Sequence, residues 1–326
     1  MMNQTIRFDE TERFDVGRTF FRHSQFWKQF HHGTARVGNL SLHYVEGGTG
    51  KPLMLIPGWP QSWYAWRYVM PNLVAAGRRV IAVDPRGVGD SDRPAGGYDM
   101  STAAADMHGL AHSLGLLTDG PLDVVGHDVG AWIGYAWAAD WRGDIRRLAV
   151  MDALVPGVSA PRTDLPADEA NLRSWHFAFN RLDDLPEILL AGRELAFLTW
   201  LFRAKSLRPW AIAHEDVEEY ARQLAAPGAL RAASAYYKAA FAPDGLAENR
   251  RRSERPLTIP VLALGAERGV GQTIVDAMQV VAKDVSGKVL SGCGHYMPEE
   301  APLRVVEALV RFLDAAPAAA GREVSE

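Results

Sequence analysis

The segment 122–131 constrains the fold most, because an apolar run, a glycine-bracketed aspartate and an apolar helix pattern follow one another directly. It reads Leu-Asp-Val-Val-Gly-His-Asp-Val-Gly-Ala. Gly126 and Gly130 permit a sharp turn from a strand into a helix, and such a turn pushes the residue between them above the carboxyl edge of a sheet. The segment therefore predicts an α/β fold in which Asp128 is presented at the start of a helix.

Strand-like apolar runs and helical patterns alternate along most of the chain. Short apolar runs at 40–44, 53–56, 80–83 and 148–151 alternate with helical patterns, which is typical of a mostly parallel sheet. Similar runs return at 260–264 and 288–290. A final amphipathic helix carries four apolar residues at helical spacing, namely Leu303, Val306, Val310 and Leu313.

Residues 158 to about 250 break this rhythm, since they show helical periodicity, many aromatic side chains and no strand-like run. An independent second domain is one interpretation. Because strands flank the segment on both sides, we instead predict a core of residues 1–155 and 251–326 interrupted by a helical cap of residues 156–250.

Composition excludes several classes of protein. The 326 residues include 35 Lys and Arg against 39 Asp and Glu, and a slightly acidic chain lacks the cationic surface that binds nucleic acid. The single Cys293 excludes an intrachain disulfide and a cysteine-based zinc site. No stretch reaches the roughly 20 apolar residues of a membrane span, and residues 1–30 lack the apolar core of a secretory signal. We expect a cytoplasmic protein without a membrane partner, and the sequence is compatible with a homodimer.

Asp128 stands where a nucleophile would stand. A carboxylate is ionised at neutral pH, since its ordinary pKa is about 3.9, and it can attack a saturated electrophilic carbon to form an ester. The alternative is that Asp128 caps the helix with its side chain. Neighbouring positions at a tight turn point apart, so we expect His127 to serve packing.

Hydrolysis of such an ester needs a base that activates water. His295 ends the segment Ser-Gly-Cys-Gly-His, which follows the last predicted strand and lies at the same sheet edge as Asp128. The base in turn needs an acid that orients it. Asp152 and Glu267 both follow core strands, and we favour Asp152 while keeping Glu267 as the alternative.

These motifs resemble the α/β-hydrolase superfamily, in particular its branch of epoxide hydrolases and dehalogenases that use an aspartate nucleophile. The segment Pro57-Gly58-Trp59-Pro60 resembles the family's His-Gly-x-Pro loop, with Pro57 in place of histidine. The resemblance implies that the backbone N–H groups of Trp59 and Val129 form an oxyanion hole. It also implies a structural role for the turn at 84–91.

The cap carries two further motifs of this resemblance. Residues 174–179 and 235–239 look like the family's cap segments that supply a histidine and a tyrosine to the epoxide oxygen. His176 and Tyr237 are therefore the expected oxygen donors, and packing in the core is the alternative for His176. We expect the substrate to contact aromatic residues that border the cleft, namely Trp59, Trp63, Trp175, Phe177 and Tyr236.

The residues beside the expected nucleophile, Asp128, distinguish epoxide hydrolases from dehalogenases within this branch of the superfamily. Haloalkane dehalogenases usually carry Trp directly after the nucleophile, and fluoroacetate dehalogenases carry arginines nearby; this chain has Val129 and Trp132 there. The resemblance thus implies an epoxide hydrolase that converts a neutral, apolar epoxide with water into a vicinal diol. A dehalogenase and a non-catalytic ligand-binding protein are the alternatives. No metal-binding spacing or phosphate loop appears, and His31 and His32 alone do not make a metal site, so we predict no cofactor.

Overall fold

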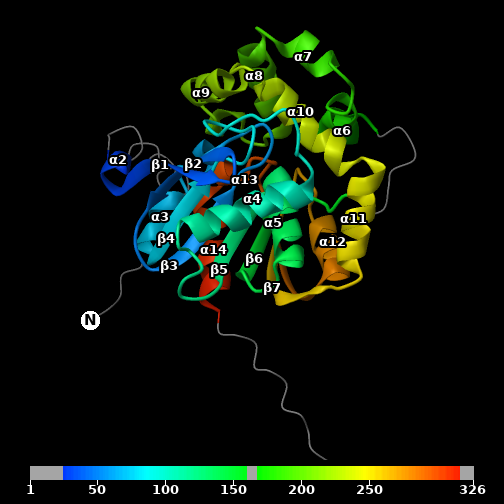
Figure 1. The fold of residues 1–326 in the computed structure, drawn as a ribbon. Coiled ribbons are helices and arrows are strands. Elements are labelled where there is room, and N and C mark those ends of the chain that lie inside the picture. Colours follow the sequence, from blue (N-terminus) through cyan, green and yellow to red (C-terminus); the bar gives the residue numbers. More distant parts are fainter. Residues whose placement is uncertain (1–24, 160–166, 316–326) are drawn as a thin grey trace, which may run out of the picture.

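The computed structural model describes residues 25–159 and 167–315, whose eight strands form one sheet (Figure 1). Its order is β1-β2-β4-β3-β5-β6-β7-β8. β1 and β2 pair antiparallel, as do β2 and β4, and the remaining pairs are parallel. The strands are β1 (Phe30–Val37), β2 (Leu40–Gly47), β3 (Lys51–Ile56), β4 (Arg78–Val83), β5 (Leu122–His127), β6 (Ile145–Met151), β7 (Leu257–Ala266) and β8 (Ala282–Leu290).

Helices cover both faces of this sheet. One hydrophobic cluster packs one face of the sheet against α4 (Met100–Ser113), α5 (Val129–Asp140) and α12 (Thr273–Val281). A second cluster packs the other face against α3 (Met70–Ala75) and α14 (Pro302–Asp314). The central parallel strands are buried on both sides, which explains why their sequences are continuous apolar runs rather than alternating ones.

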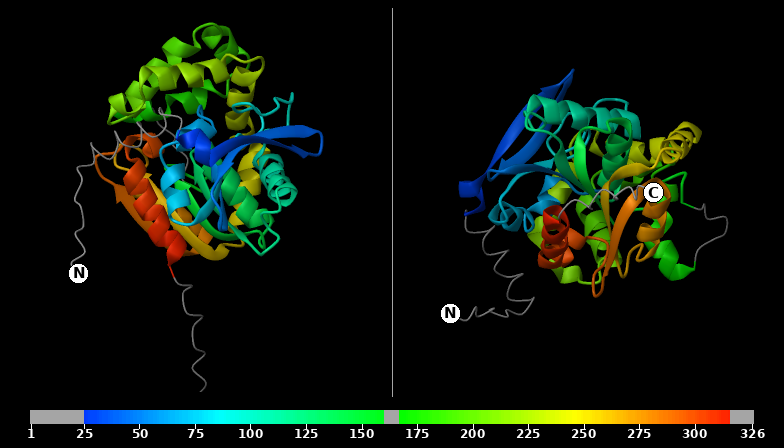
Figure 2. Two further views of the ribbon diagram at one scale, coloured as in Figure 1. Left: turned by 90° about the vertical axis from the view of Figure 1, so that its left-hand side faces the viewer. Right: turned by 90° about the horizontal axis from the view of Figure 1, so that it is seen from below.

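The helices between β6 and β7 lie mainly over one end of the sheet, shown in green in Figures 1 and 2. They are α6 (Asp168–Phe179), α7 (Leu185–Leu190), α8 (Glu194–Lys205), the 3-10 helix η2 (Pro209–Ala211), α9 (His214–Leu224) and α10 (Ala229–Ala240). The last helix of the insertion, α11 (Pro243–Ser253), instead packs beside α5 and α12, where Arg252 bonds Asp140 at 2.6 Å. Short helices α2 (Phe26–Gln29), η1 (Trp63–Trp66) and α13 (Met297–Glu300) complete the described elements.

The predicted α/β-hydrolase architecture is confirmed, with two differences in detail. Sequence periodicity did not reveal β1, whose exposed, polar residues reflect its place at the sheet edge. The final helix is amphipathic as expected and buries Leu313, but its buried face is centred on Val305, Leu309 and Phe312. Leu303, Val306 and Val310 are only half-buried. Most of the N-terminal stretch tested for a secretory signal lies outside the described residues. Among the described helices, none has the length and apolar character that a membrane crossing requires.

Candidate active site

Asp128 lies in a tight turn between β5 and α5. Its backbone φ is 51° with ψ of −120°, a conformation that residues with side chains rarely adopt. The turn closes only because glycines allow a close approach: a Cβ on Gly126 would lie 2.2 Å from the Gly130 carbonyl oxygen. A Cβ on Gly130 would lie 2.3 Å from the Ile56 carbonyl oxygen. The Gly-x-Asp-x-Gly spacing is therefore a packing requirement of the turn that presents Asp128.

The buried carboxylate of Asp128 contacts Trp59 and does not cap α5. No side-chain cap hydrogen bond forms, and the Trp59 N–H donates to Asp128 Oδ1 at 2.9 Å. Trp59 lies in the loop after β3 and precedes a cis bond to Pro60. Val129 is the first residue of α5, and the first N–H groups of a helix have no partner within it. Both residues expected to supply oxyanion donors thus adjoin the carboxylate.

His295 lies between two carboxylates that follow neighbouring strands. Its Nδ1 is 2.7 Å from Asp152 Oδ2, and its Nε2 is 3.5 Å from Asp128 Oδ2. The first distance is a short hydrogen bond, and the second is an ion-pair contact beyond hydrogen-bond length, so Nε2 has no hydrogen-bond partner among the described residues. The geometry fits a base whose Nδ1–H is fixed by Asp152 while Nε2 faces the nucleophile.

The two carboxylates proposed as the orienting acid differ in what they contact. Asp152 has a φ of 48°, and its Oδ1 accepts the N–H groups of Ala266 and Val270, each at 2.9 Å. These bonds leave Oδ2 aimed at His295. Glu267 is exposed and accepts the Gly292 N–H at 2.5 Å. The structure therefore brings Asp152, and not Glu267, against the imidazole.

The charges of these groups are interdependent. Burial alone would raise the pKa of Asp128, but the nearby imidazole of His295 outweighs burial and holds this pKa below its ordinary value. Burial and the charge of Lys205 act to lower the pKa of His295, yet its contacts with Asp128 and Asp152 raise it overall. Asp128 is consequently an ionised carboxylate, and its negative charge favours a proton on His295.

His176 of α6 and Tyr237 of α10 meet over the Trp59 ring. His176 stacks on Trp59 with ring centroids 5.0 Å apart, and the Tyr237 ring lies 5.5 Å from His176 and 5.6 Å from Trp59. Within the described part of the chain, neither the Tyr237 hydroxyl nor either His176 ring nitrogen has a hydrogen-bond partner. Burial lowers the pKa of His176 and raises that of Tyr237, and the charge of Asp128 raises the latter further. Both groups are neutral donors at neutral pH.

Tyr236 and Tyr237 are adjacent in sequence and face different surroundings. The Tyr236 hydroxyl donates to the Arg86 carbonyl oxygen at 2.9 Å, so it is held by the core. Its ring also lines a pocket between cap and core whose walls include Trp59 and Val129. Asp128, His295 and Tyr237 do not line that pocket.

The remaining aromatic residues expected to contact substrate differ in what they pack against. Phe177 packs beside Tyr237, with ring centroids 5.4 Å apart, and Trp175 packs away from it among Phe179, Phe197 and Trp200. Trp63 belongs to the second hydrophobic cluster and contacts Phe26 and Trp27. Both Phe177 and Trp175 contact His176, with ring centroids 4.5 Å and 6.0 Å away, and Phe177 also contacts Tyr237.

His127 serves the packing of the site, as expected. Its Nε2 lies 2.9 Å from the His295 carbonyl oxygen, and this hydrogen bond holds the loop that carries His295. Burial, with the adjacent His295, lowers the pKa of His127 to about 4 and keeps its ring neutral.

Sequence reasoning missed two residues close to the site, Lys205 and Tyr296. Lys205 ends α8 and is buried, with its Nζ 6.0 Å from the Trp59 ring and 5.9 Å from the Tyr296 ring. Tyr296 is fully buried beside His295, and no described residue bonds its hydroxyl. Neither residue belongs to a recognisable motif. The sequence nevertheless shows a lysine at the end of an aromatic-rich helical segment and a tyrosine directly after His295, and both features could have pointed to the site.

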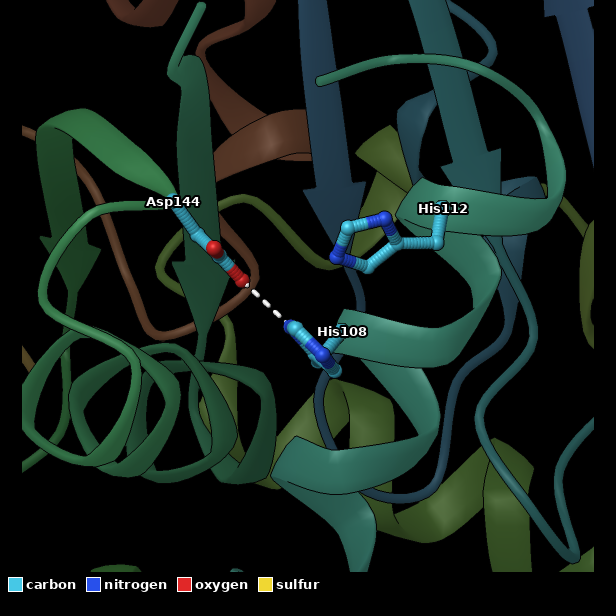
Figure 3. Close-up of side chains that lie close together, drawn as sticks. All are labelled: His108, His112 and Asp144. Carbon is cyan, nitrogen blue, oxygen red and sulfur yellow. Dashed lines mark hydrogen bonds and ion pairs between the residues drawn. The ribbon is translucent and has the colours of Figure 1, made fainter. Parts of the chain in front are cut away.

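Potential metal ligands gather away from Asp128, at the amino end of β6 (Figure 3). The ligand atoms of His108, His112 and Asp144 lie within 4.8 Å of one another. His108 Nδ1 is already 2.6 Å from Asp144 Oδ2, which also accepts the Trp137 indole N–H at 2.8 Å. These hydrogen bonds already occupy His108 Nδ1 and Asp144 Oδ2, two of the three potential ligand atoms.

Comparisons with known proteins agree with this geometry. The family model described as the alpha/beta hydrolase fold matches residues 51–302. A soluble epoxide hydrolase from Corynebacterium sp. is 35% identical over 86% of this chain and 96% of its own length. The crystal structure of Cfl2 from Burkholderia cenocepacia has a TM-score of 0.82 and 39% identity, covering 87% of this chain and 96% of that one. A fluoroacetate dehalogenase from Burkholderia sp. is 26% identical over 85% of this chain and 91% of its own length. The chain therefore belongs to the α/β-hydrolase family, as its motifs predict, and is a hydrolase.

Proposed function

We propose that this enzyme hydrolyses an apolar epoxide to a vicinal diol through an ester of Asp128. One observation carries the proposal: two neutral donors without a protein partner, on His176 and Tyr237, adjoin the loop that holds an ionised Asp128. Epoxide opening needs a nucleophile on carbon and a donor on oxygen at the same time, because a bare alkoxide is a poor leaving group. A halide leaves as an anion that hydrogen bonds stabilise, so a dehalogenase needs no transferred proton, whereas an opening epoxide does.

In the first half-reaction, an Asp128 carboxylate oxygen bonds to an epoxide carbon and the carbon–oxygen bond of the ring breaks. The electron pair of that bond goes to the ring oxygen, which takes the Tyr237 hydroxyl proton while His176 donates a hydrogen bond. The products are a hydroxyalkyl ester of Asp128 and a tyrosinate.

In the second half-reaction, His295 takes a proton from water and hydroxide adds to the Asp128 carboxyl carbon. The N–H groups of Trp59 and Val129 stabilise the oxyanion, at about 3 kcal/mol for each such donor. Collapse expels the diol alkoxide, which takes the proton of the added hydroxyl. The proton on His295 restores Tyr237, so the net reaction consumes one epoxide and one water.

The surroundings of Asp128 favour an uncharged substrate. Val129 and Trp132, on the first turn of α5, provide no cation for a carboxylate, and the rings of Trp132 and Phe177 flank Tyr237. An apolar body would replace water against these rings, which favours a bulky or aromatic epoxide. A cytoplasmic location and a homodimer stay predictions from the sequence.

The test traps the ester. In His295→Gln, the first half-reaction still runs and the second stops, so intact-mass analysis after incubation with styrene oxide, 1,2-epoxyhexane or a polycyclic epoxide finds the mass of one epoxide added. The added mass is absent from Asp128→Asn. Wild-type enzyme in H₂¹⁸O at single turnover should carry the label into the Asp128 carboxylate and not into the diol, whose new oxygen comes from Asp128. Label in the diol at the first turnover would mean that water attacks the epoxide directly. An unshifted mass and no diol across the panel contradict the proposal.

The alternatives give different products. A dehalogenase releases halide from fluoroacetate or chloroalkanes, and this release exceeds diol formation. A non-catalytic ligand-binding protein binds an epoxide without product, and Asp128→Asn leaves that binding unchanged.

A further inference from the structure

Lys205 is a buried cation that the reaction described above does not use. It lies at the C-terminal end of the cap helix α8, is only 6% exposed, and projects its ammonium group between the rings of Trp59 and Tyr296. Burying a charged group is costly, and a lysine at this position could have been replaced by an apolar residue of similar length. The buried ammonium group acts on the charges of both Asp128 and His295.

Two contacts fix Lys205 against the catalytic loop. Its backbone carbonyl accepts the His295 N–H at 3.2 Å, and a Cβ on Gly294 would lie 2.8 Å from the same carbonyl oxygen. The cap and the loop therefore touch through the backbone of Lys205. A change of its side chain leaves that backbone contact in place.

His295 must be neutral to act as a base, yet its surroundings change during the reaction. Before the reaction, the carboxylates of Asp128 and Asp152 both favour the imidazolium. Once Asp128 becomes an ester, one of these negative charges disappears, and Lys205 then faces His295 with only Asp152 opposing it. Like charges in a buried site repel strongly because little water screens them.

We propose that Lys205 is a positioning residue for ester hydrolysis: its ammonium group disfavours a positive charge on His295 when Asp128 is esterified, and so keeps the imidazole neutral to accept a proton from water. This inference rests on the proposed function. Burial lowers the pKa of Lys205, and the carboxylates of Asp128 and Asp152 act to raise it. The ordinary pKa of lysine, about 10.4, lies about four units above that of histidine, and the role requires that the ammonium keeps its proton while the imidazole gives up its own.

The charged groups that act most strongly on His295, and the titratable groups packed beside it, support or limit this role. Asp128 and Asp152 favour the imidazolium, and Lys205 exerts the largest opposing effect of any single charge. His127 from β5 and His176 from α6 are neutral, and Tyr296 stays protonated because burial and the nearby carboxylates raise its pKa. Glu300 is bound by backbone N–H groups of the loop, including those of Gly294 and Tyr296. Lys205 is thus the cation among these groups that responds to loss of the Asp128 charge.

The equilibrium test uses Asp128→Asn, which removes the same charge that esterification removes. The titration of His295 is followed by NMR of histidine labelled with ¹³C at Cε1, assigned with His295→Gln. Adding Lys205→Met to this variant should raise the titration midpoint of His295 by about one pH unit or more. Adding Lys205→Arg, which keeps a cation, should leave it within about 0.3 unit.

The kinetic test follows ester formation and decay by acid quench and intact mass between pH 5 and 9, with an epoxide that the wild type hydrolyses. In Lys205→Met the acid limb of ester decay should move to higher pH by about one unit, so the ester accumulates near pH 6 and clears at pH 8. Lys205→Gln serves as a second charge-free variant if Lys205→Met unfolds. Lys238→Met, which removes an exposed lysine paired with Asp183 at 2.9 Å, is the matched control.

Unmoved midpoints in both tests overturn the inference. So does a lower plateau rate with an unmoved acid limb, because that result means that the ammonium only stabilises the oxyanion. If no epoxide is hydrolysed by the wild type, the proposed function fails, while the NMR titration still decides the role of Lys205.

Discussion

Two buried polar clusters lie where the cap meets the core, and they differ in how completely their groups are bonded. In the first, which we call the anchor (Gln61, Arg67, Asp216, Tyr220 and Glu299), opposite charges meet directly. Arg67 contacts Glu299 at 2.5 Å and Asp216 at 2.9 Å, and the Tyr220 hydroxyl donates to Glu299 at 3.1 Å. The anchor joins α9 of the cap to α13 and the end of η1.

In the second cluster, the candidate active site, donors without a described partner surround the nucleophile. These are the hydroxyls of Tyr237 and Tyr296 and the ring nitrogens of His176. An unbonded buried polar group costs about 1–3 kcal/mol of stability, so a fold keeps several together only where a ligand bonds them. The comparison teaches that the charges of the anchor meet partners within the protein, whereas the hydroxyls and ring nitrogens gathered near Asp128 do not.

The largest loss of turnover should come from Asp128→Asn, which changes the candidate active site and leaves the anchor intact. The amide still accepts the Trp59 N–H but cannot attack carbon, so turnover of an epoxide should fall about 10⁴-fold or more. The melting temperature should change little. Product formation and thermal unfolding are measured in parallel with Asp183→Asn, an exposed control. Retained turnover in the Asp128 variant would mean that another residue is the nucleophile.

Arg67→Met should break the anchor instead. It leaves Glu299 buried without its cation, and removing one partner of a buried pair costs about 3–5 kcal/mol of unfolding free energy. Urea denaturation measures the loss. Arg222→Met, which breaks an exposed pair with Glu219, should cost at most about 1 kcal/mol. Equal losses in the two variants would show that the anchor contributes no more than a surface pair.

The sequence allowed prediction of those candidate-site residues whose positions follow from local spacing and strand ends. Gly126 and Gly130 specify the turn around Asp128, and His295 follows a strand that must end at the same edge. The anchor was not predicted, because Arg67, Asp216 and Glu299 are far apart in the chain and follow no spacing rule. Lys205 was missed for the same reason: its position beside Asp128 depends on how the cap folds back over the sheet.

His127 is an intermediate case, since its Nε2 is bonded and its Nδ1 has no described partner. Its pKa of about 4 in the folded protein lies below the ordinary 6.5, so the unfolded chain binds the extra proton between these pH values. Its contribution to stability is therefore complete above pH 6.5 and is lost as pH falls toward 4, by about 3 kcal/mol. His127→Gln should show a correspondingly shallower loss of unfolding free energy on acidification, measured by urea denaturation from pH 7 to 4. Parallel curves for variant and wild type would contradict a buried neutral ring.

Tyr236 and Tyr237 show the same contrast between a bonded and an unbonded hydroxyl at two adjacent positions of one helix. Tyr237→Phe removes an unbonded donor, so turnover should fall roughly 10–100-fold, with His176 supplying the remaining stabilisation of the oxygen. Stability should stay level or rise, because no protein bond is lost and a buried hydroxyl is gone. Tyr236→Phe removes the bond to the Arg86 carbonyl and should cost about 1 kcal/mol of unfolding free energy, with turnover within about twofold. Steady-state turnover and urea denaturation of both variants decide the matter, and an exchange of the two outcomes would assign the oxygen donor to Tyr236.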